Sequence, residues 1–253
     1  MDTFMAKLSG MVYSAMSDSE IDETSFKETP TLDANNYIIS NKDKTDLTLI
    51  DAGNGISFKS LIEEMEKLNL SYKNIKKVIL THIHVDHLLG IYPLLLKMNS
   101  NPPKIYAFGH AARTIKNADI SAIFPGSLGL GPQTFKVKII PIDVNELTNN
   151  QEISCAEYKF RILHTPGHSE GSICLYDQKN KILISGDVVF SGGAFGRFDF
   201  PGGSLKKLKN SIKILSQLDV KYLLPGHMSF SANGNKEIKL ALRIIESTAN
   251  YFF

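Results

Sequence analysis

Short runs of β-branched and apolar residues recur along the chain and predict β-strands. Nine such runs are present, at residues 37–39, 47–50, 78–80, 105–108, 137–140, 158–163, 173–176, 182–184 and 222–224. Nine short strands are too many for one small sheet. We therefore expect two sheets packed face to face.

Apolar residues spaced three and four positions apart predict helices between these strands. One apolar stripe covers residues 58–68 behind Ser57, and another covers residues 205–218 behind Ser204; both serines are candidate N-caps. Residues 86–98 and 236–247 show two more helical patterns, and Pro93 must lie near the start of its helix or at a kink. Strands and helices thus recur in two halves, which places helices on the outside of the two sheets.

The least regular segment is residues 109–150. Turn-forming and apolar residues mix within it, as they do in a loop that covers a pocket. Phe124, Leu128, Leu130 and Phe135 suit an apolar part of a substrate, and they suit the core equally well. We treat residues 1–253 as a single domain in which residues 109–150 are an insertion that caps the site.

Composition excludes several classes of protein. With 253 residues, 43% hydrophobic and 21% charged, the chain is neither disordered nor collagen-like nor a disulfide scaffold. A net charge of +2 gives no strong sign of nucleic acid or of a membrane surface as partner. Cys155 and Cys174 form no Cys-x-x-Cys pair and are expected to be buried. We expect a cytoplasmic protein with a small-molecule substrate. The sequence leaves open whether the protein is a homodimer.

The strongest chemical signal is Thr81-His82-Ile83-His84-Val85-Asp86-His87, directly after an apolar strand. Three imidazoles and one carboxylate at a strand end, where the chain turns, can converge on one point. Neutral imidazole suits zinc or iron, and a carboxylate adds compensating negative charge. This segment therefore predicts a metal site.

Three more candidate ligands follow apolar strands and turn-forming residues, namely His168, Asp187 and His227. Seven ligands divide into two sets. The first metal would take His82, His84 and His168, the second would take Asp86, His87 and His227, and Asp187 would reach both. Each metal then has four protein ligands and can share a water, which would be the nucleophile.

At these residues the sequence resembles the metallo-β-lactamase-fold superfamily. Its His-x-His-x-Asp-His signature corresponds to residues 82–87, and the Thr165-Pro166-Gly167-His168, Gly186-Asp187 and Pro225-Gly226-His227 segments match in order. The resemblance covers residues 36–227 and implies an α/β (α+β) fold, an αββα sandwich of two mixed sheets with the metals at one edge. It also implies that Asp51, at an early strand end, orients the ligands.

A narrower resemblance lies in residues 196–203, Gly-Arg-Phe-Asp-Phe-Pro-Gly-Gly. This segment is similar to one in the glyoxalase II-like (hydroxyacylglutathione hydrolase) and persulfide dioxygenase branches, which often carry Thr where Phe198 stands. We interpret Arg197 and Asp199 chiefly as a structural pair beside the site. Arg197 as a clamp for a substrate carboxylate stays open.

Three features bear on the substrate. Only 26 residues follow His227, too few for the helical domain that holds glutathione in typical glyoxalase II enzymes, so a glutathione thioester is not expected. The lactonase branch carries Tyr where Phe190 stands, so a phenolic donor is missing. His164 is close enough to His168 to support a ligand or to be purely structural, and His110 is expected at the surface.

The sequence therefore predicts a dinuclear hydrolase of a small ester, thioester or lactone that acts through metal-bound hydroxide. Zinc is the expected metal, with iron or manganese also suited. Asp86 and Asp187 are the expected catalytic residues, because Asp86 can accept a proton as well as ligate. The first alternative is a mononuclear iron persulfide dioxygenase using His82, His168 and Asp187. A nuclease of the same fold is the second, and a non-catalytic binding module is the third.

Overall fold

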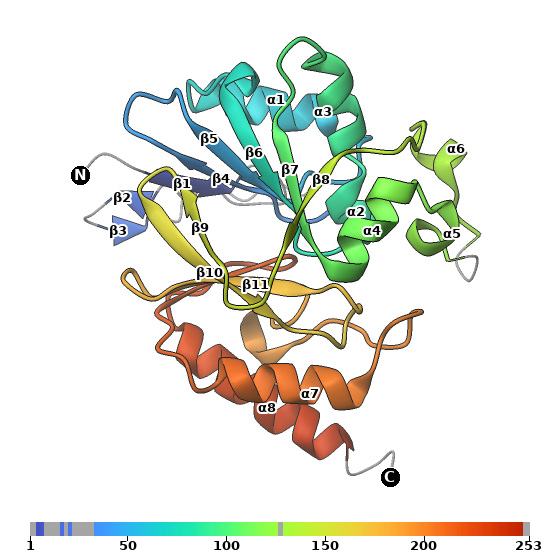
Figure 1. Ribbon diagram of the computed structural model, residues 1–253. Helices are drawn as coiled ribbons and strands as arrows, with labels where there is room; N and C mark the ends of the chain where they lie inside the picture. Colours follow the sequence, from blue (N-terminus) through green and yellow to red (C-terminus); the bar gives the residue numbers. More distant parts are fainter. Residues whose placement is uncertain (1–3, 8–15, 18–19, 22–32, 126–128, 250–253) are drawn as a thin grey trace.

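The chain forms four layers, in the order helices, sheet, sheet, helices (Figure 1). The computed structural model describes residues 4–7, 16–17, 20–21, 33–125 and 129–249. Both sheets are mixed, so the predicted αββα sandwich is confirmed. None of the helices in these ranges combines the length and the apolar composition that crossing a bilayer requires.

The first sheet has the strand order β1-β4-β5-β6-β7-β8. Its strands are β1 Phe4–Lys7, β4 Tyr37–Ser40, β5 Leu47–Ile50, β6 Ile75–Ile79, β7 Lys104–Phe108 and β8 Val144–Leu147. β4 pairs antiparallel with β1 and β5, whereas β5 to β8 are parallel neighbours. The carboxyl ends of β5, β6 and β7 therefore meet at one edge.

The second sheet has the order β13-β12-β11-β10-β9. Its strands are β9 Glu152–Cys155, β10 Tyr158–His164, β11 Ile173–Asp177, β12 Ile182–Gly186 and β13 Tyr222–Pro225. Only β12 and β13 are parallel, so their carboxyl ends also lie together. A small separate ladder joins β2 Met16–Ser17 to β3 Glu20–Ile21.

Both faces of the central strands are buried, and alternate residues face different layers. In β5, Leu49 packs with the outer helices and Ile50 packs between the sheets. In β12, Leu183 faces the helices of the second sheet and Ile184 faces the first sheet. Cys155 and Cys174 are both buried and unbridged, as predicted.

The helices cover the outer faces of the two sheets (Figure 1). The first sheet is covered by α1 Phe58–Lys67, α3 Ile91–Lys97 and α4 Gly109–Asn117. The second is covered by α7 Leu205–Leu215 and α8 Gly234–Ala249. The shorter helical segments are η1 Tyr72–Asn74, α2 Val85–Leu88, α5 Ile120–Ile123, α6 Pro132–Phe135 and η3 Ser191–Gly193.

One predicted strand is wrong, and one predicted helix cap is right in position only. Residues 137–140 form no strand; the strand of this region is β8, which begins seven residues after the predicted start. Only Val144 and Leu147 of β8 are buried, with polar Asn145 and Glu146 between them, so its apolar pattern is too thin to be recognised. Ser57 occupies the N-cap position of α1 as predicted, but its hydroxyl bonds to Asp33 rather than to the helix, whereas the Ser204 side chain does cap α7.

The predicted helix over residues 86–98 is divided into α2 and α3 at Gly90. A Cβ at Gly90 would clash with the Ala52 carbonyl oxygen, which explains why this position is glycine. Pro93 is the third residue of α3, near the helix start as expected. Of the residues expected in the cap, Leu128 lies outside the described residues.

Candidate metal centre

The seven predicted ligands meet at the edge where strands of both sheets end. Two lie in the loop after β6 and two in α2; the others follow β10, β12 and β13. They are His82, His84, Asp86, His87, His168, Asp187 and His227. Loops at the carboxyl ends of strands hold side chains on a rigid frame, which suits a metal site.

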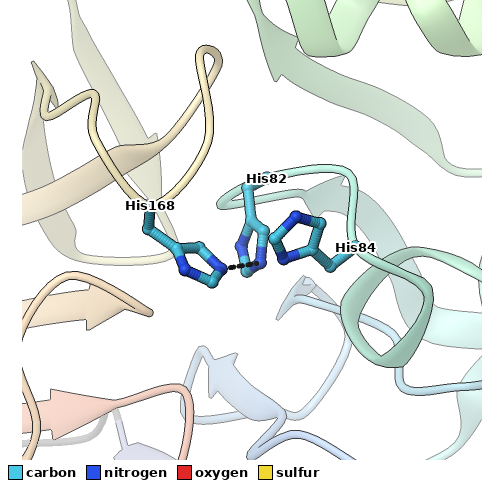
Figure 2. A group of neighbouring side chains, drawn as sticks. All are labelled: His82, His84 and His168. Carbon is cyan, nitrogen blue, oxygen red and sulfur yellow. Dashed lines mark hydrogen bonds between the residues drawn. The ribbon is translucent and has the colours of Figure 1, made fainter. Parts of the chain in front are cut away.

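The first group is His82, His84 and His168 (Figure 2). His82 and His84 come from one loop, and His168 points at them from the turn after β10. The ring centroids lie 4.4 to 4.8 Å apart. One nitrogen from each ring therefore falls within a sphere small enough for a single ion.

Hydrogen bonds assign the tautomers of two of these rings. His168 Nδ1 donates to the Arg197 carbonyl oxygen at 2.7 Å. Thr81 Oγ1 donates to Asp51 at 2.8 Å and therefore accepts from His82 Nδ1 at 3.0 Å. Both Nε2 atoms then present lone pairs to each other across 3.1 Å. A cation between them removes this repulsion, so the residues fit a metal.

The second group is Asp86, His87 and His227, with Asp187 between the two groups. Asp187 Oδ1 lies 3.3 Å from His87 Nε2, and Oδ2 lies 3.5 Å from His168 Nε2 and 3.3 Å from His227 Nε2. When four ligand atoms surround an ion tetrahedrally, each ~2.05 Å from the ion, neighbouring ligand atoms are about 3.3 Å from one another. The spacing around Asp187 therefore suits ligands of an ion on either side.

Two buried atoms, one in the second group and one on Asp187, make no hydrogen bond within the described residues. They are His87 Nε2 and Asp187 Oδ1. Leaving buried polar atoms unsatisfied is costly. Coordination of an ion would satisfy both atoms.

Proton affinities differ between the two groups. Burial and neighbouring histidines hold the pKa of His82 well below its usual value, and burial lowers the pKa of His84 to about 3. Burial also favours neutral His87 and His227, but the surrounding carboxylates outweigh it. The pKa of His87 is raised well above its usual value, and that of His227 is raised to about 9.

Metal binding to the metal-free protein should therefore differ in pH dependence between the groups. Ligation requires neutral imidazole, so an ion at His87 and His227 must displace protons and should bind more tightly as pH rises toward 9. An ion at His82, His84 and His168 displaces no protons at neutral pH, because these imidazoles are already neutral. Calorimetric Zn²⁺ titrations in buffers of different ionisation enthalpy should show proton release for one of two ions. Equal release for both would contradict this assignment.

Asp51 is hydrogen-bonded to candidate ligands of both groups, directly or through Thr81. Its carboxylate accepts from His87 Nδ1 at 2.8 Å and from both the backbone N and the hydroxyl of Thr81 at 2.8 Å. Thr81 in turn holds His82. Asp51 thus fixes the direction in which two imidazoles point.

Sequence reasoning missed a clamp on the loop that carries His227. Asn35 Nδ2 donates to the carbonyl oxygens of Pro225 and Met228 at 2.9 and 2.8 Å, and Asn35 N donates to Gly226. The Tyr37 hydroxyl also donates to Pro225. Nothing local marks Asn35, because its partners lie 190 residues away along the chain.

Removing this clamp should weaken metal binding without unfolding the protein. In Asn35→Ala, the loop bearing His227 loses two side-chain hydrogen bonds, so we expect about a 10-fold to 100-fold weaker affinity for one of two ions. Asn41→Ala is the matched control, since Asn41 binds backbone in an exposed turn. Equal affinities in Asn35→Ala and the unchanged protein would exclude a positioning role.

The other predicted site residues lie around the two groups. Arg197 pairs bidentately with Asp199 at 2.7 and 2.6 Å, and its backbone rather than its guanidinium contacts His168. The Phe190 ring meets that of His227 edge to face at 5.8 Å. His164 stacks on Phe108, and its Nε2 donates to the Glu170 carbonyl oxygen, which is a structural arrangement.

A cavity of about 500 Å³ opens on the ligands. Five of the seven line it: His84, Asp86, His168, Asp187 and His227. A molecule in this cavity would reach both ligand groups. Its volume is typical of sites for small organic molecules.

Comparison with known proteins agrees with this geometry. The sequence profile of the metallo-beta-lactamase superfamily matches residues 29–227. Hydroxyacylglutathione hydrolase GloC of Haemophilus influenzae is 31% identical over 200 residues, which are 77% of this chain and 86% of that protein. Acyl-coenzyme A thioesterase MBLAC2 of Homo sapiens is 30% identical over 156 residues, 59% of this chain and 54% of that protein.

A solved structure is also similar. It is the crystal structure of TTHA1623 in a di-iron-bound form, with a TM-score of 0.64 and 27% identity. The match covers 82% of this chain and 94% of that one. The relatives are thus hydrolases, and the structural neighbour holds two metal ions.

Proposed function

This chain belongs to the metallo-beta-lactamase superfamily, and we propose that it hydrolyses a small thioester with the help of two divalent metal ions. One observation carries the proposal: Asp187 lies between two groups of histidines, with an oxygen within 3.5 Å of each. His82, His84 and His168 would hold one ion; Asp86, His87 and His227 would hold the other.

The chemistry needs few protein groups besides the ligands. Two bound divalent ions would lower the pKa of a water and polarise the scissile carbonyl. A water held between the two ions would be the nucleophile, so the reaction needs no Ser, Cys or Lys side chain. Asp86 lines the cavity with an oxygen 3.0 Å from His227 Nε2, so its carboxylate could accept a proton as well as hold an ion.

The leaving group favours a thioester over an ester or lactone. Phe190 gives no hydroxyl to protonate a leaving alkoxide. A thiol has a pKa of about 8.5, so a thiolate leaves without receiving a proton. The two relatives described above are a hydroxyacylglutathione hydrolase and an acyl-coenzyme A thioesterase, whose named substrates are both thioesters.

A direct assay tests the proposal. Protein loaded with Zn²⁺ or Fe²⁺ is given thioesters of N-acetylcysteamine, the matching oxygen esters and lactones, and thiol release or acid production is followed. We expect thioesters to be cleaved fastest and chelation to stop the reaction, with recovery on adding metal. Lack of thioester cleavage at full metal loading would contradict the proposal.

A further inference from the structure

The cavity beside the candidate metal centre has two apolar walls. One comes from the segment containing α5 and α6 and consists of Ile123, Phe124, Pro125, Leu130 and Phe135. The facing wall has Phe190 and Phe200. These two rings reach the ligands themselves: Phe190 lies 5.8 Å from the His227 ring and Phe200 lies 5.5 Å from the His84 ring. Apolar surface therefore begins immediately beside the reacting groups.

Much of the first wall also belongs to the core. Ile123, Phe124 and Phe135 are buried in the cluster beneath the first sheet, and the rings of Phe124 and Phe135 lie 5.8 Å apart. Leu130 is only partly buried and packs against the same cluster. A chain seated here would be surrounded by side chains that do not need to be ordered on binding.

Among the described residues that line the cavity, Arg197 is the one lysine or arginine. Its positive charge is compensated by the carboxylate of Asp199. Its guanidinium is paired bidentately with Asp199 and lies 3.8 Å from the centre of the Phe200 ring. The hydrogen bonds from Arg197 hold the pKa of Asp199 at about 2, so this pair persists at neutral pH. Arg197 is therefore not a free partner for a carboxylate on the acyl group.

We infer that the cavity binds the acyl group of an uncharged, apolar thioester, with the carbonyl at the histidines and the hydrocarbon between the two walls. This inference rests on the proposed thioester hydrolysis and adds the class of acyl group. The walls would then determine specificity, while the seven ligands determine reaction type.

Acyl chain length provides the first test. N-acetylcysteamine thioesters from acetyl to octanoyl are hydrolysed by the metal-loaded protein. We expect kcat/KM to rise by up to about fourfold per methylene until the cavity is filled. Butanoyl should exceed succinyl, which carries a carboxylate, by at least about tenfold, because a buried unpaired charge is costly. A flat or falling series, or a preference for succinyl, overturns the inference while hydrolysis itself stands.

A variant that fills the cavity provides the second test. Leu130→Trp should lower the octanoyl to acetyl ratio of kcat/KM by about tenfold or more. Leu96→Trp is the matched control, because Leu96 is 79% exposed on α3 and does not line the cavity. The ratio should be unchanged there. An equal ratio in Leu130→Trp and the unchanged protein would contradict the inference.

A binding measurement distinguishes a failure of the proposed thioester hydrolysis from a failure of the proposed acyl-binding cavity. Ketone analogues, in which a methylene replaces the thioester sulfur, cannot be hydrolysed, and their affinity is measured by calorimetry. If no thioester is cleaved, the proposed function fails; tighter binding of the octanoyl than of the acetyl analogue still supports the apolar cavity. Equal affinity for both analogues overturns it.

Discussion

Replacing Asp187 by asparagine is expected to lower hydrolysis by at least about a thousandfold and to reduce metal content in both ligand groups. Asp187 is 7% exposed and places oxygens within 3.5 Å of His87, His168 and His227. Asparagine keeps the shape but loses the charge that would compensate two cations. Metal assistance contributes several kcal/mol to such reactions, and each ~1.36 kcal/mol is tenfold in rate.

Asp177→Asn is the matched control for this change. Asp177 is also buried, ends the neighbouring strand β11, and accepts hydrogen bonds from Asn180 rather than from a candidate ligand. We expect some loss of thermal stability in this variant and normal metal content by elemental analysis. If Asp187→Asn bound two metal ions per chain and kept near-normal turnover, Asp187 would not bridge the two ions.

The second large effect is expected from His87→Ala and His227→Ala. Each change should remove one of the two ions and lower hydrolysis by orders of magnitude, because the remaining ion would act alone. His227 is the better target, since its side chain is 34% exposed and its loss leaves little buried space. His110→Ala, at a histidine outside the cluster, serves as control.

These two variants also separate the hydrolase from the dioxygenase that the sequence leaves open. A single iron on His82, His168 and Asp187 would use neither His87 nor His227, so both variants would keep much of their activity. Stoichiometric oxygen uptake with a thiol persulfide, at one iron per chain, would favour the dioxygenase. No oxygen uptake together with loss of hydrolysis would favour two ions.

Much of the fold could be predicted because its signals are local. The stripes that become α1 and α7 and the apolar runs that become β5, β6 and β12 are each visible within about ten residues. β8 was not recognised, because two buried residues separated by two polar ones give little periodicity. Its pairing with β7 is a tertiary effect.

The cluster of candidate ligands could be predicted because histidines and aspartates stand out where they follow apolar strands. Their supports could not be predicted as readily. Asn35 looks like any polar residue before a strand, and Arg197 holds His168 through a backbone carbonyl that every residue possesses. Asp51, at the end of β5, could be expected to orient the ligands only through the resemblance to the superfamily.

The shape of the cavity was the least accessible feature. Phe124, Leu130 and Phe135 could equally have filled the core, and the structure shows that two of them do both, since Phe124 and Phe135 are buried and also line the cavity. Which face of an apolar side chain meets solvent depends on how α5, α6 and the loop of Phe190 come together. No local pattern encodes that arrangement.

The most direct test of a two-ion centre is an activity titration. Metal-free protein at pH 7 receives Zn²⁺ in steps, and hydrolysis of a butanoyl thioester is measured at each ratio of ion to chain. Two cooperating ligand groups predict low turnover through the first equivalent, a rise during the second, and a plateau at two ions per chain. A plateau at one ion per chain, or no turnover at two, would contradict the account.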